Sequence, residues 1–309
     1  MNTTTARMGD WPLPRIGLGT GAWQQVGAIQ HGDVPALVNF VLSQPRPFFD
    51  TAPLYGHSES ETWLGEALRG VERPSYRVAS KAGWALDPGG KTHNDLSRDG
   101  ILRSVENSLQ RLGVGYLDVG HLHDPDCCLK DALDTALPTL CELREQGVIR
   151  AVGSGMNQWQ MLAEFAQHAD VDCMLLAGRY TLLEQTSLPL LELCRQKNIA
   201  LFLGGVYNSG ILATGAVPGA RYQYAPASPE ILAKVARLEA VCARHRVSLQ
   251  SAALQFPLAH PAVRTLIIGA NSVTEFASAL AAANAPVPAG LWQELRHEGL
   301  IEAGAPVPN

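Results

Sequence analysis

The sequence predicts an α/β protein that folds as a single (β/α)8 TIM barrel with one extra helix near its C-terminus. Short runs of apolar residues alternate with amphipathic segments almost from end to end of the 309 residues. Nearly continuous Val/Ile/Leu character in such runs indicates parallel strands covered by helices, and eight such units close a barrel. No low-complexity linker interrupts the pattern, so we predict that residues 1–309 form one domain.

The predicted elements follow one another in a regular order. The apolar runs predict strands at 15–18, 47–50, 76–80, 117–122, 149–152, 173–176, 199–203 and 265–268. The segments between them predict helices at 34–42, 60–68, 98–112, 133–145, 159–167, 188–197 and 229–245, and 291–298 predicts a further helix outside the barrel. Residues 58–61 (SESE) are expected to start the second of these helices, with a capping hydroxyl and acidic residues in the first turn. The stretches 87–90 and 213–227 are rich in Pro or Gly and predict long loops at the catalytic end.

The composition excludes several classes of protein. Hydrophobic residues make up 46% of the chain, which is enough for a large core, and the net charge of −5 argues against nucleic acid or an anionic membrane as a partner. The 6 cysteines show no paired framework, and the first residues lack an apolar leader. No run of about 18 apolar residues is present. We therefore expect a cytoplasmic protein with reduced thiols.

Polar side chains close three successive predicted strands. Asp50 ends the second strand, Tyr55 lies in the loop after it, and Lys81 and His123 end the third and fourth strands. Barrel enzymes take their catalytic residues from such strand ends. A phenol has an ordinary pKa of about 10, and a nearby ammonium lowers that pKa. We predict that Tyr55 exchanges a proton with a carbinol oxygen, that Lys81 held by Asp50 lowers the pKa of Tyr55, and that His123 orients the substrate oxygen. Singly, each could be a surface lysine, a half-buried tyrosine, a helix cap or a core histidine; together they favour catalysis.

Three segments carry a resemblance to a known family. Residues 49–56 (FDTAPLYG), 80–81 (SK) and 123–126 (HDPD) resemble the signature blocks of the aldo-keto reductase superfamily, and the resemblance extends from 17–20 to 267–270. It implies a nicotinamide-dependent barrel with an Asp/Tyr/Lys/His tetrad. Residues 178–185 and 204–212 are most similar to bacterial D-threo-aldose, L-fucose and L-galactose 1-dehydrogenases, which oxidise the anomeric carbon of a sugar to the lactone. Pyridoxal 4-dehydrogenase belongs to a similar branch.

The same resemblance implies where the cofactor binds. The chain departs from the family at 155–156, where Gly-Met stands for the usual Ser-Asn pair, at Ala177, which replaces a Gln, and at Gly204, which replaces a stacking Tyr. Asn157 and Tyr207 are candidates to substitute for them. The other implied cofactor residues are Gly19, Thr20, Gly205, Ser209, Gly269, Asn271 and Glu275.

Glu275 favours NAD+ over NADP+. Many relatives place an arginine at this position, after the last strand, where it pairs with the 2′-phosphate of NADP+. A carboxylate repels that phosphate and can accept a hydrogen bond from a free 2′-hydroxyl. The alternative interpretation of Glu275 is a solvated residue in the first turn of the last barrel helix. NADP therefore stays possible if Arg or Lys elsewhere binds the phosphate.

Aromatic and polar residues in the predicted loops are candidates for the substrate pocket. Trp23, Trp84 and Tyr207 offer flat faces that suit the CH-rich face of a sugar, and Asn208 and Arg179 offer polar groups for its hydroxyls. Each could equally pack within a loop, and Arg179 could form a structural salt bridge.

Three other patterns suggest sites that we do not predict. Residues 17–22 (GLGTGA) fit the GxGxxA form of the dinucleotide fingerprint, but neither a clear helix nor the required acidic residue follows. His121 and His123 could both point inward as metal ligands, yet other strand ends offer no further ligands, so no metal is predicted and His121 is assigned to the barrel interior. Cys127 and Cys128 are adjacent and cannot form a CxxC redox pair.

The sequence therefore predicts an NAD(P)-dependent aldose 1-dehydrogenase that acts on a small sugar or hemiacetal, with Tyr55 as the general base. One alternative is a pyridoxal 4-dehydrogenase or general carbonyl reductase on the same barrel. A second is a non-catalytic NAD(H) sensor, and a third is a metal-dependent hydrolase that uses His121 and His123. The stereochemistry of the sugar and the oligomeric state do not follow from the sequence.

Overall fold

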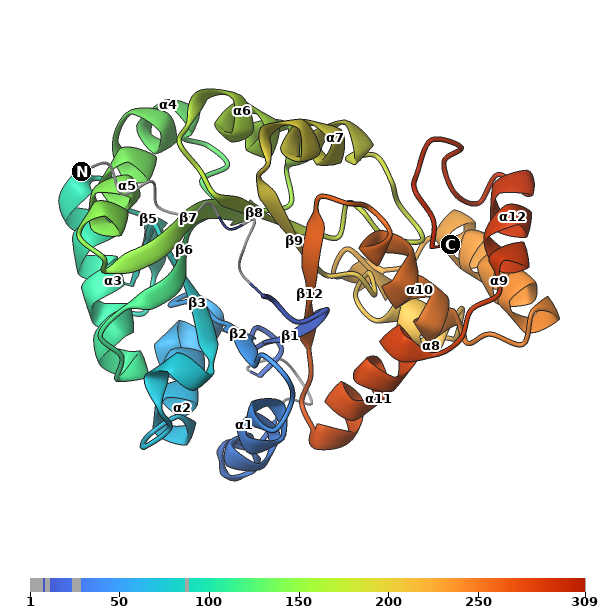
Figure 1. Cartoon of the computed structure of the whole chain (residues 1–309), viewed down its shortest axis with the longest axis horizontal. Helices are drawn as coiled ribbons and strands as arrows, with labels where there is room; N and C mark the ends of the chain where they lie inside the picture. The colour runs from blue at the N-terminus through green and yellow to red at the C-terminus, as the bar shows by residue number, and fades with distance from the viewer. Residues whose placement is uncertain (1–7, 9–11, 24–28, 87–88, 309) are drawn as a thin grey trace.

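The computed structural model describes residues 8, 12–23, 29–86 and 89–308. A closed barrel of parallel strands forms its centre, in the order β1-β12-β9-β8-β7-β6-β3-β2 (Figure 1). The fold class predicted from the sequence, a (β/α)8 barrel, is confirmed. The barrel strands are β1 (Ile16–Gly19), β2 (Phe48–Asp50), β3 (Arg77–Ala82), β6 (Leu117–His123), β7 (Ile149–Met156), β8 (Cys173–Ala177), β9 (Ala200–Gly204) and β12 (Val263–Gly269).

Alternate residues of these strands fill the barrel interior. The rings of Phe48 and Phe202 meet edge to face with their centroids 5.7 Å apart, and His121 packs against Phe202 at 5.8 Å. Gly153 provides the space for His121, because a Cβ at residue 153 would lie 2.8 Å from its Nδ1 atom and 2.4 Å from the carbonyl oxygen of Cys173. The interior is therefore a packed core rather than a channel, as in other barrels of this class.

Helices cover the outside of the barrel, because the outward faces of parallel strands must also be buried. α10 and α11 pack against β12 and against each other (Figure 1). The helices that follow the eight barrel strands are α1 (Val34–Leu42), α2 (Glu59–Ala67), α3 (Arg98–Leu112), α5 (Leu137–Glu145), α6 (Trp159–His168), α7 (Leu188–Lys197), α10 (Leu249–Leu258) and α11 (Val273–Asn284).

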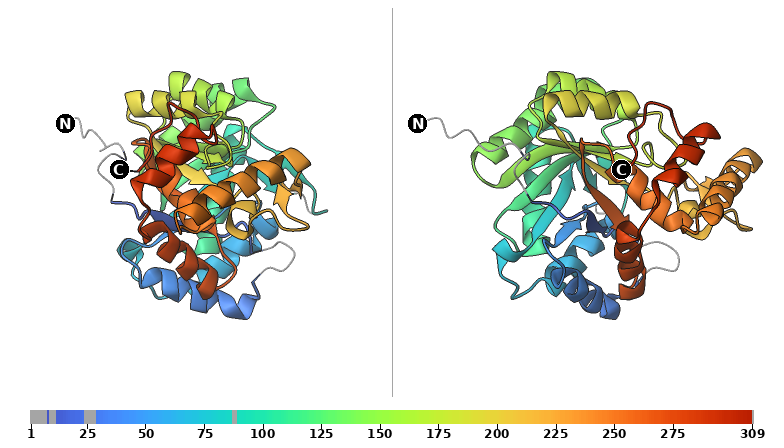
Figure 2. Two further views of the ribbon diagram at one scale, coloured as in Figure 1. Left: turned by 90° about the vertical axis from the view of Figure 1, so that its right-hand side faces the viewer. Right: turned by 45° about the vertical axis from the view of Figure 1, so that its right-hand side comes forward.

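Long connections add smaller elements to this frame. The predicted loop at 213–227 contains a two-stranded hairpin, and the loop after β3 contains another; residues 87–88 of that loop lie outside the described residues. The extra C-terminal helix is present as α12, which packs on α9 beyond the ring of barrel helices (Figure 2). These elements are β4 (Trp84–Leu86), β5 (Thr92–Asn94), α4 (Leu129–Asp131), a π-helical turn (Ala132–Ala136), α8 (Ile211–Thr214), β10 (Arg221–Tyr222), β11 (Ala225–Pro226), α9 (Pro229–Arg244) and α12 (Ala289–His297).

The start of α2 differs from the prediction. Ser58 precedes the helix, but its hydroxyl donates to the carbonyl oxygen of Pro53 at 3.1 Å and makes no cap hydrogen bond. The reason is the backbone, since Gly56, His57 and Ser58 all have left-handed φ values of 56°, 52° and 77°. The predicted capping hydroxyl is therefore wrong, and this turn instead presents Tyr55 to the end of the barrel. None of the described helices is long and apolar enough to cross a membrane.

Candidate active site

The structure brings together the three polar residues that close predicted strands and Tyr55 of the adjoining loop. Lys81 Nζ lies 2.6 Å from Asp50 Oδ1 and donates a second hydrogen bond, 2.8 Å long, to the carbonyl oxygen of Thr51. The same Nζ atom lies 4.6 Å from the centroid of the Tyr55 ring. The rings of Tyr55 and His123 are perpendicular, with centroids 5.7 Å apart. A phenol, an ammonium, a carboxylate and an imidazole thus face one another at the C-terminal end of the barrel.

Burial and charge act in opposite directions on these groups. Burial lowers the pKa of Lys81, but attraction to Asp50 and Tyr55 outweighs that effect and raises it above its ordinary value, so the lysine carries its charge. Burial raises the pKa of Asp50, and Lys81 opposes that rise. Burial, with smaller contributions from Lys81 and His121, holds the pKa of His123 well below its ordinary value. His123 is therefore neutral at physiological pH and has one ring nitrogen that can donate a hydrogen bond.

The pKa of Tyr55 corrects one expectation. Lys81 lowers it, as predicted, but burial raises it by more, and Asp50 adds a further rise. The net pKa of Tyr55 in the free protein therefore lies above its ordinary value of 10.0 rather than below it. The phenol is protonated at neutral pH in this state.

A glycine allows the Tyr55 ring to sit where it does. A Cβ at residue 21 would lie 3.3 Å from Cζ of Tyr55, which is tighter than ordinary contact. Gly19 lies on β1 beside β12, and a Cβ there would lie 2.8 Å from the side chain of Ile267. The glycines at 19 and 21 of the segment 17–22 are therefore explained by side-chain packing at the barrel end. The structure shows a barrel strand here, in agreement with the rejection of a dinucleotide fingerprint.

A cleft opens beside Tyr55 at the ends of β1, β9 and β12. Its volume is about 360 Å³, which is within the range of small-molecule and cofactor sites. The positions of the family departures Ala177 and Gly204 lie in its wall. A Cβ at residue 204 would meet only Leu175 and Ala177, at ordinary contact distances, so the missing side chain leaves open space. The predicted cofactor and substrate residues that line the cleft are Gly19, Gly205, Tyr207, Asn208, Ser209 and Gly269.

Four predicted cofactor residues do not line this cleft. The Thr20 hydroxyl is buried and donates to the Thr51 hydroxyl at 2.8 Å. Asn157 lines a neighbouring cavity of about 230 Å³, and its amide donates to the carbonyl oxygen of Ala177 at 2.9 Å. Asn271 and Glu275 form a helix cap, in which the Glu275 carboxylate accepts a hydrogen bond from the backbone N–H of Asn271 at 2.8 Å. Glu275 is nevertheless exposed at the surface.

The structure separates the predicted substrate residues. Trp23 is fully buried, and its indole N–H donates to the carbonyl oxygen of Ala270 at 3.1 Å, so it packs under the site instead of lining the cleft. Asn208 is 4% exposed and its amide donates to the carbonyl oxygen of Gly178. Arg179 makes the alternative salt bridge, 3.3 Å from Glu184.

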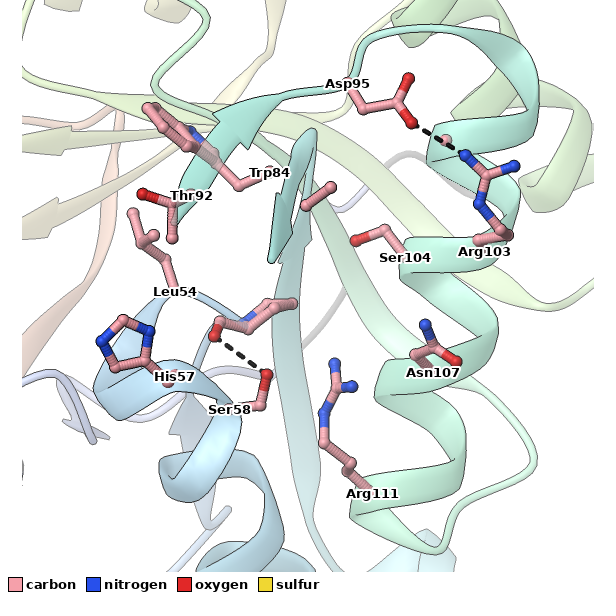
Figure 3. A pocket seen from close by; sticks show the side chains of 13 residues that line it. Leu54, His57, Ser58, Trp84, Thr92, Asp95, Arg103, Ser104, Asn107 and Arg111 are labelled. Atoms are coloured by element: carbon pink, nitrogen blue, oxygen red, sulfur yellow. Dashed lines mark hydrogen bonds and ion pairs between the residues drawn. The ribbon is translucent and has the colours of Figure 1, made fainter. Parts of the chain in front are cut away.

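Trp84 stands between the site and a second cavity. Its indole N–H donates to the carbonyl oxygen of His123 at 2.8 Å, which ties the hairpin β4–β5 to the end of β6. Figure 3 shows Trp84 and Leu54 on one side of this cavity and Arg103 and Asn107 of α3 on the other. The cavity has a volume of about 350 Å³.

Tyr224 is a functional candidate that the sequence reasoning missed. It lies in the turn of the hairpin β10–β11 and lines both the cleft and the neighbouring cavity. The residue is 69% exposed. Its amide donates to the Ser209 hydroxyl at 3.0 Å, which ties the hairpin to the loop after β9. The only sequence signal was an aromatic residue within a Pro/Gly-rich stretch, which does not reveal where the loop folds back.

His121 shows no sign of ligating a metal. It is fully buried, and burial followed by the charge of Lys81 lowers its pKa to about 3. Both ring nitrogens are buried without a hydrogen-bond partner. Among the described residues, no group of three or more His, Cys, Asp or Glu side chains could hold a metal ion. Those residues supply no ligand set for the hydrolase alternative.

Comparison with known proteins adds to this geometry. The sequence profile of the Aldo/keto reductase family matches residues 15–297. A pyridoxal 4-dehydrogenase from Microbacterium luteolum is 35% identical over 323 residues, covering 93% of this chain and 94% of that protein. A D-threo-aldose 1-dehydrogenase from a Pseudomonas species is 35% identical over 276 residues, covering 82% of this chain and 84% of that protein. The structure of an aldo-keto reductase from Bacillus halodurans in its holo form superposes with a TM-score of 0.76 at 22% identity, covering 95% of this chain and 94% of that chain.

Proposed function

Because the chain belongs to the aldo/keto reductase family and is therefore an oxidoreductase, we propose that it oxidises the anomeric C1 hydroxyl of an aldose to the lactone. The proposed substrates are sugars of the L-fucose, D-arabinose or L-galactose type. The observation that carries the proposal is the approach of Lys81 and His123 to Tyr55, which lines the cleft. The likeness to a D-threo-aldose 1-dehydrogenase supports the sugar class.

The proposed chemistry assigns a task to each residue. Tyr55 accepts the proton of the anomeric hydroxyl as the general base. His123 is neutral and donates a hydrogen bond to the oxygen of that hydroxyl. Lys81, held by Asp50 at 2.6 Å, favours the phenolate form of Tyr55 through its positive charge.

We propose that the cleft receives the nicotinamide end of a dinucleotide cofactor. The strand ends at Gly204 and Gly269 carry no side chain, so a flat ring can approach the backbone there. When bound, this cofactor supplies the hydride acceptor. The residues proposed to hold it are Gly19, Asn157, Gly205, Tyr207, Ser209, Gly269, Asn271 and Glu275, whereas Thr20 is fully buried and is not proposed as a contact.

We propose NAD+ as the preferred cofactor, with NADP+ as the alternative. Glu275 is exposed at the start of α11, where its negative charge would repel a 2′-phosphate. One of its oxygens already accepts a hydrogen bond from the backbone N–H of Asn271, so the second oxygen is left for a ribose hydroxyl. A higher kcat/KM with NADP+ than with NAD+ would overturn this choice.

A substrate panel tests the proposed function. L-Fucose, D-arabinose, L-galactose and pyridoxal are each offered with NAD+ and with NADP+, and the reaction is followed by the absorbance of the reduced cofactor. The Tyr55→Phe variant should lose the chemical step while it binds the cofactor almost as well as the wild type. Near-normal turnover by that variant would refute the mechanism.

Oxidation of pyridoxal, also as a cyclic hemiacetal, is the second candidate function. It is favoured by the 35% identity to a pyridoxal 4-dehydrogenase over 93% of the chain. The panel separates the two candidates by the kcat/KM values of pyridoxal and of the sugars. Tight binding of NAD(H) without turnover of any panel member would instead favour a non-catalytic sensor.

A further inference from the structure

The residue after His123 has no role in the proposed chemistry so far. Asp124 follows β6 directly and has a left-handed φ of 40°, with its amide donating to the carbonyl oxygen of Gly155 at 3.0 Å. In a regular strand, the side chains of adjacent residues point to opposite faces. The left-handed backbone at Asp124 breaks that alternation, so its carboxylate lies on the same side as the imidazole, with Oδ2 3.7 Å from Nε2 of His123.

Within the part of the chain that the structure describes, no protein group donates a hydrogen bond to this carboxylate. The distance of 3.7 Å to His123 is too long for a hydrogen bond, and the side chain is only 35% exposed. With about a third of the side chain exposed, water still reaches the carboxylate in the free protein. A hydroxyl of a bound ligand can take the place of that water and donate to the carboxylate.

The position of Asp124 puts that donor close to the reacting atoms, because Oδ2 lies 3.7 Å from Nε2 of His123 and the His123 ring lies 5.7 Å from the Tyr55 ring. The carboxylate raises the pKa of Tyr55, so the two side chains interact electrostatically. Burial and the neighbouring Asp126 raise the pKa of Asp124 to about 6, and Lys81 opposes this rise, while His123 is neutral. Above about pH 6 the group is ionised and accepts hydrogen bonds only.

We propose that Asp124 determines substrate specificity by accepting a hydrogen bond from the hydroxyl on the carbon next to the reacting carbon. This inference rests on the proposed function, since it assumes a hemiacetal whose O1 contacts Tyr55 and His123. In an aldose, the C2 hydroxyl is vicinal to O1, so two neighbouring oxygens meet two neighbouring protein groups, His123 Nε2 and the Asp124 carboxylate. In the pyridoxal hemiacetal, the ring hydroxyl lies one bond farther from the reacting carbon. A simple aldehyde has no such donor.

A matched pair of sugars tests the assignment. 2-Deoxy-D-ribose is D-arabinose without its C2 hydroxyl, and 2-deoxy-L-fucose has the same relation to L-fucose. The wild type should oxidise each deoxy sugar with a kcat/KM about 10- to 100-fold below that of its parent, as expected when a charged hydrogen bond is lost. The Asp124→Asn variant should reduce this ratio to about threefold or less, chiefly by losing activity on the parent sugar. Asn tolerates the left-handed backbone at this position.

Two controls separate specificity from general damage. Asp126→Asn removes an equal charge two residues away, from a carboxylate that accepts a hydrogen bond from Gln158 at 3.1 Å, and should keep the wild-type ratio. In the wild type, the sugar ratio should fall as the pH drops below about 6, because Asp124 becomes protonated; in Asp124→Asn it should not depend on pH.

The possible failures are distinguishable. If the wild type oxidises the parent and deoxy sugars equally well, or if Asp124→Asn keeps the full ratio, the assignment of Asp124 is wrong and the proposed function stands. If the wild type oxidises no sugar of the panel, the aldose function fails and the assignment falls with it.

Discussion

Replacing Lys81 with Met tests the electrostatic core of the site. The Nζ atom lies 4.6 Å from the centroid of the Tyr55 ring. At an effective dielectric constant of about 20, a unit charge at this distance favours the phenolate by about 3.6 kcal/mol. Because Tyr55 borders the open cleft, solvent screening reduces this to about 2 kcal/mol, which is about 1.5 pKa units. We therefore expect the kcat/KM for sugar oxidation near neutral pH to fall about 10- to 100-fold.

The pH profile of kcat/KM for oxidation shows in which direction Lys81 shifts the pKa of Tyr55. Tyr55 acts as a base only after it loses its proton, so the oxidation rate rises with pH until the pKa of Tyr55 is passed. Removing Lys81 raises that pKa further, because the attraction that opposes burial is gone. The rising limb of the kcat/KM profile should move to higher pH by about 1.5 units in Lys81→Met. A limb that stays at the wild-type pH would refute the assigned role of Lys81.

A double variant separates loss of chemistry from loss of folding. Lys81→Met leaves Asp50 buried without its partner, which costs about 3–5 kcal/mol of unfolding free energy. Adding Asp50→Asn removes the unpaired charge, so the double variant should recover most of the thermal stability. Its activity should stay low, because Tyr55 still lacks the neighbouring ammonium. Recovery of activity together with stability would show that Lys81 acts only through folding.

Two further changes test other parts of the site. Gly21→Ala should displace the Tyr55 ring and lower kcat several-fold, because the new Cβ would lie 3.3 Å from Cζ of Tyr55. Gly32→Ala is the matched control, since no atom lies within 4 Å of its Cβ. Equal kcat values in the two variants would contradict the packing argument. Glu275→Gln should cost about 0.5–1 kcal/mol of unfolding free energy, because it weakens the hydrogen bond to the backbone N–H of Asn271. It should also lower the ratio of kcat/KM with NAD+ to kcat/KM with NADP+. An unchanged ratio would show that Glu275 takes no part in cofactor selection.

The sequence contained enough information for the barrel and for the four polar residues at the strand ends. All eight predicted strands overlap the observed ones, because runs such as 199–203 are apolar on both faces. The convergence of Asp50, Lys81 and His123 follows from the topology, since β2, β3 and β6 are neighbours and their C-terminal ends meet.

Other features depend on tertiary contacts that leave little trace in the sequence. The helix α10, which spans residues 249–258, was not among the predicted helices. Residues 251–257 are all buried, so the segment lacks the exposed polar face that marks an amphipathic helix. Trp23 was assigned to the substrate pocket by its residue type, but the chain folds it inward to the carbonyl oxygen of Ala270. The carboxylate of Asp124 comes close to His123 only because of a local left-handed backbone.

The pKa of Tyr55 shows why residue types alone do not settle the direction of the reaction. The presence of Lys81 gives the sign of one contribution, but the depth of burial, which only the structure supplies, gives a larger one of opposite sign. The protonated phenol of the free protein is the form that donates a proton in carbonyl reduction, whereas oxidation requires the phenolate. One site can therefore serve both directions, with oxidation favoured as the pH rises. Any positive charge that enters the cleft with the oxidised cofactor would act in the same sense as Lys81 and shift Tyr55 towards the basic form.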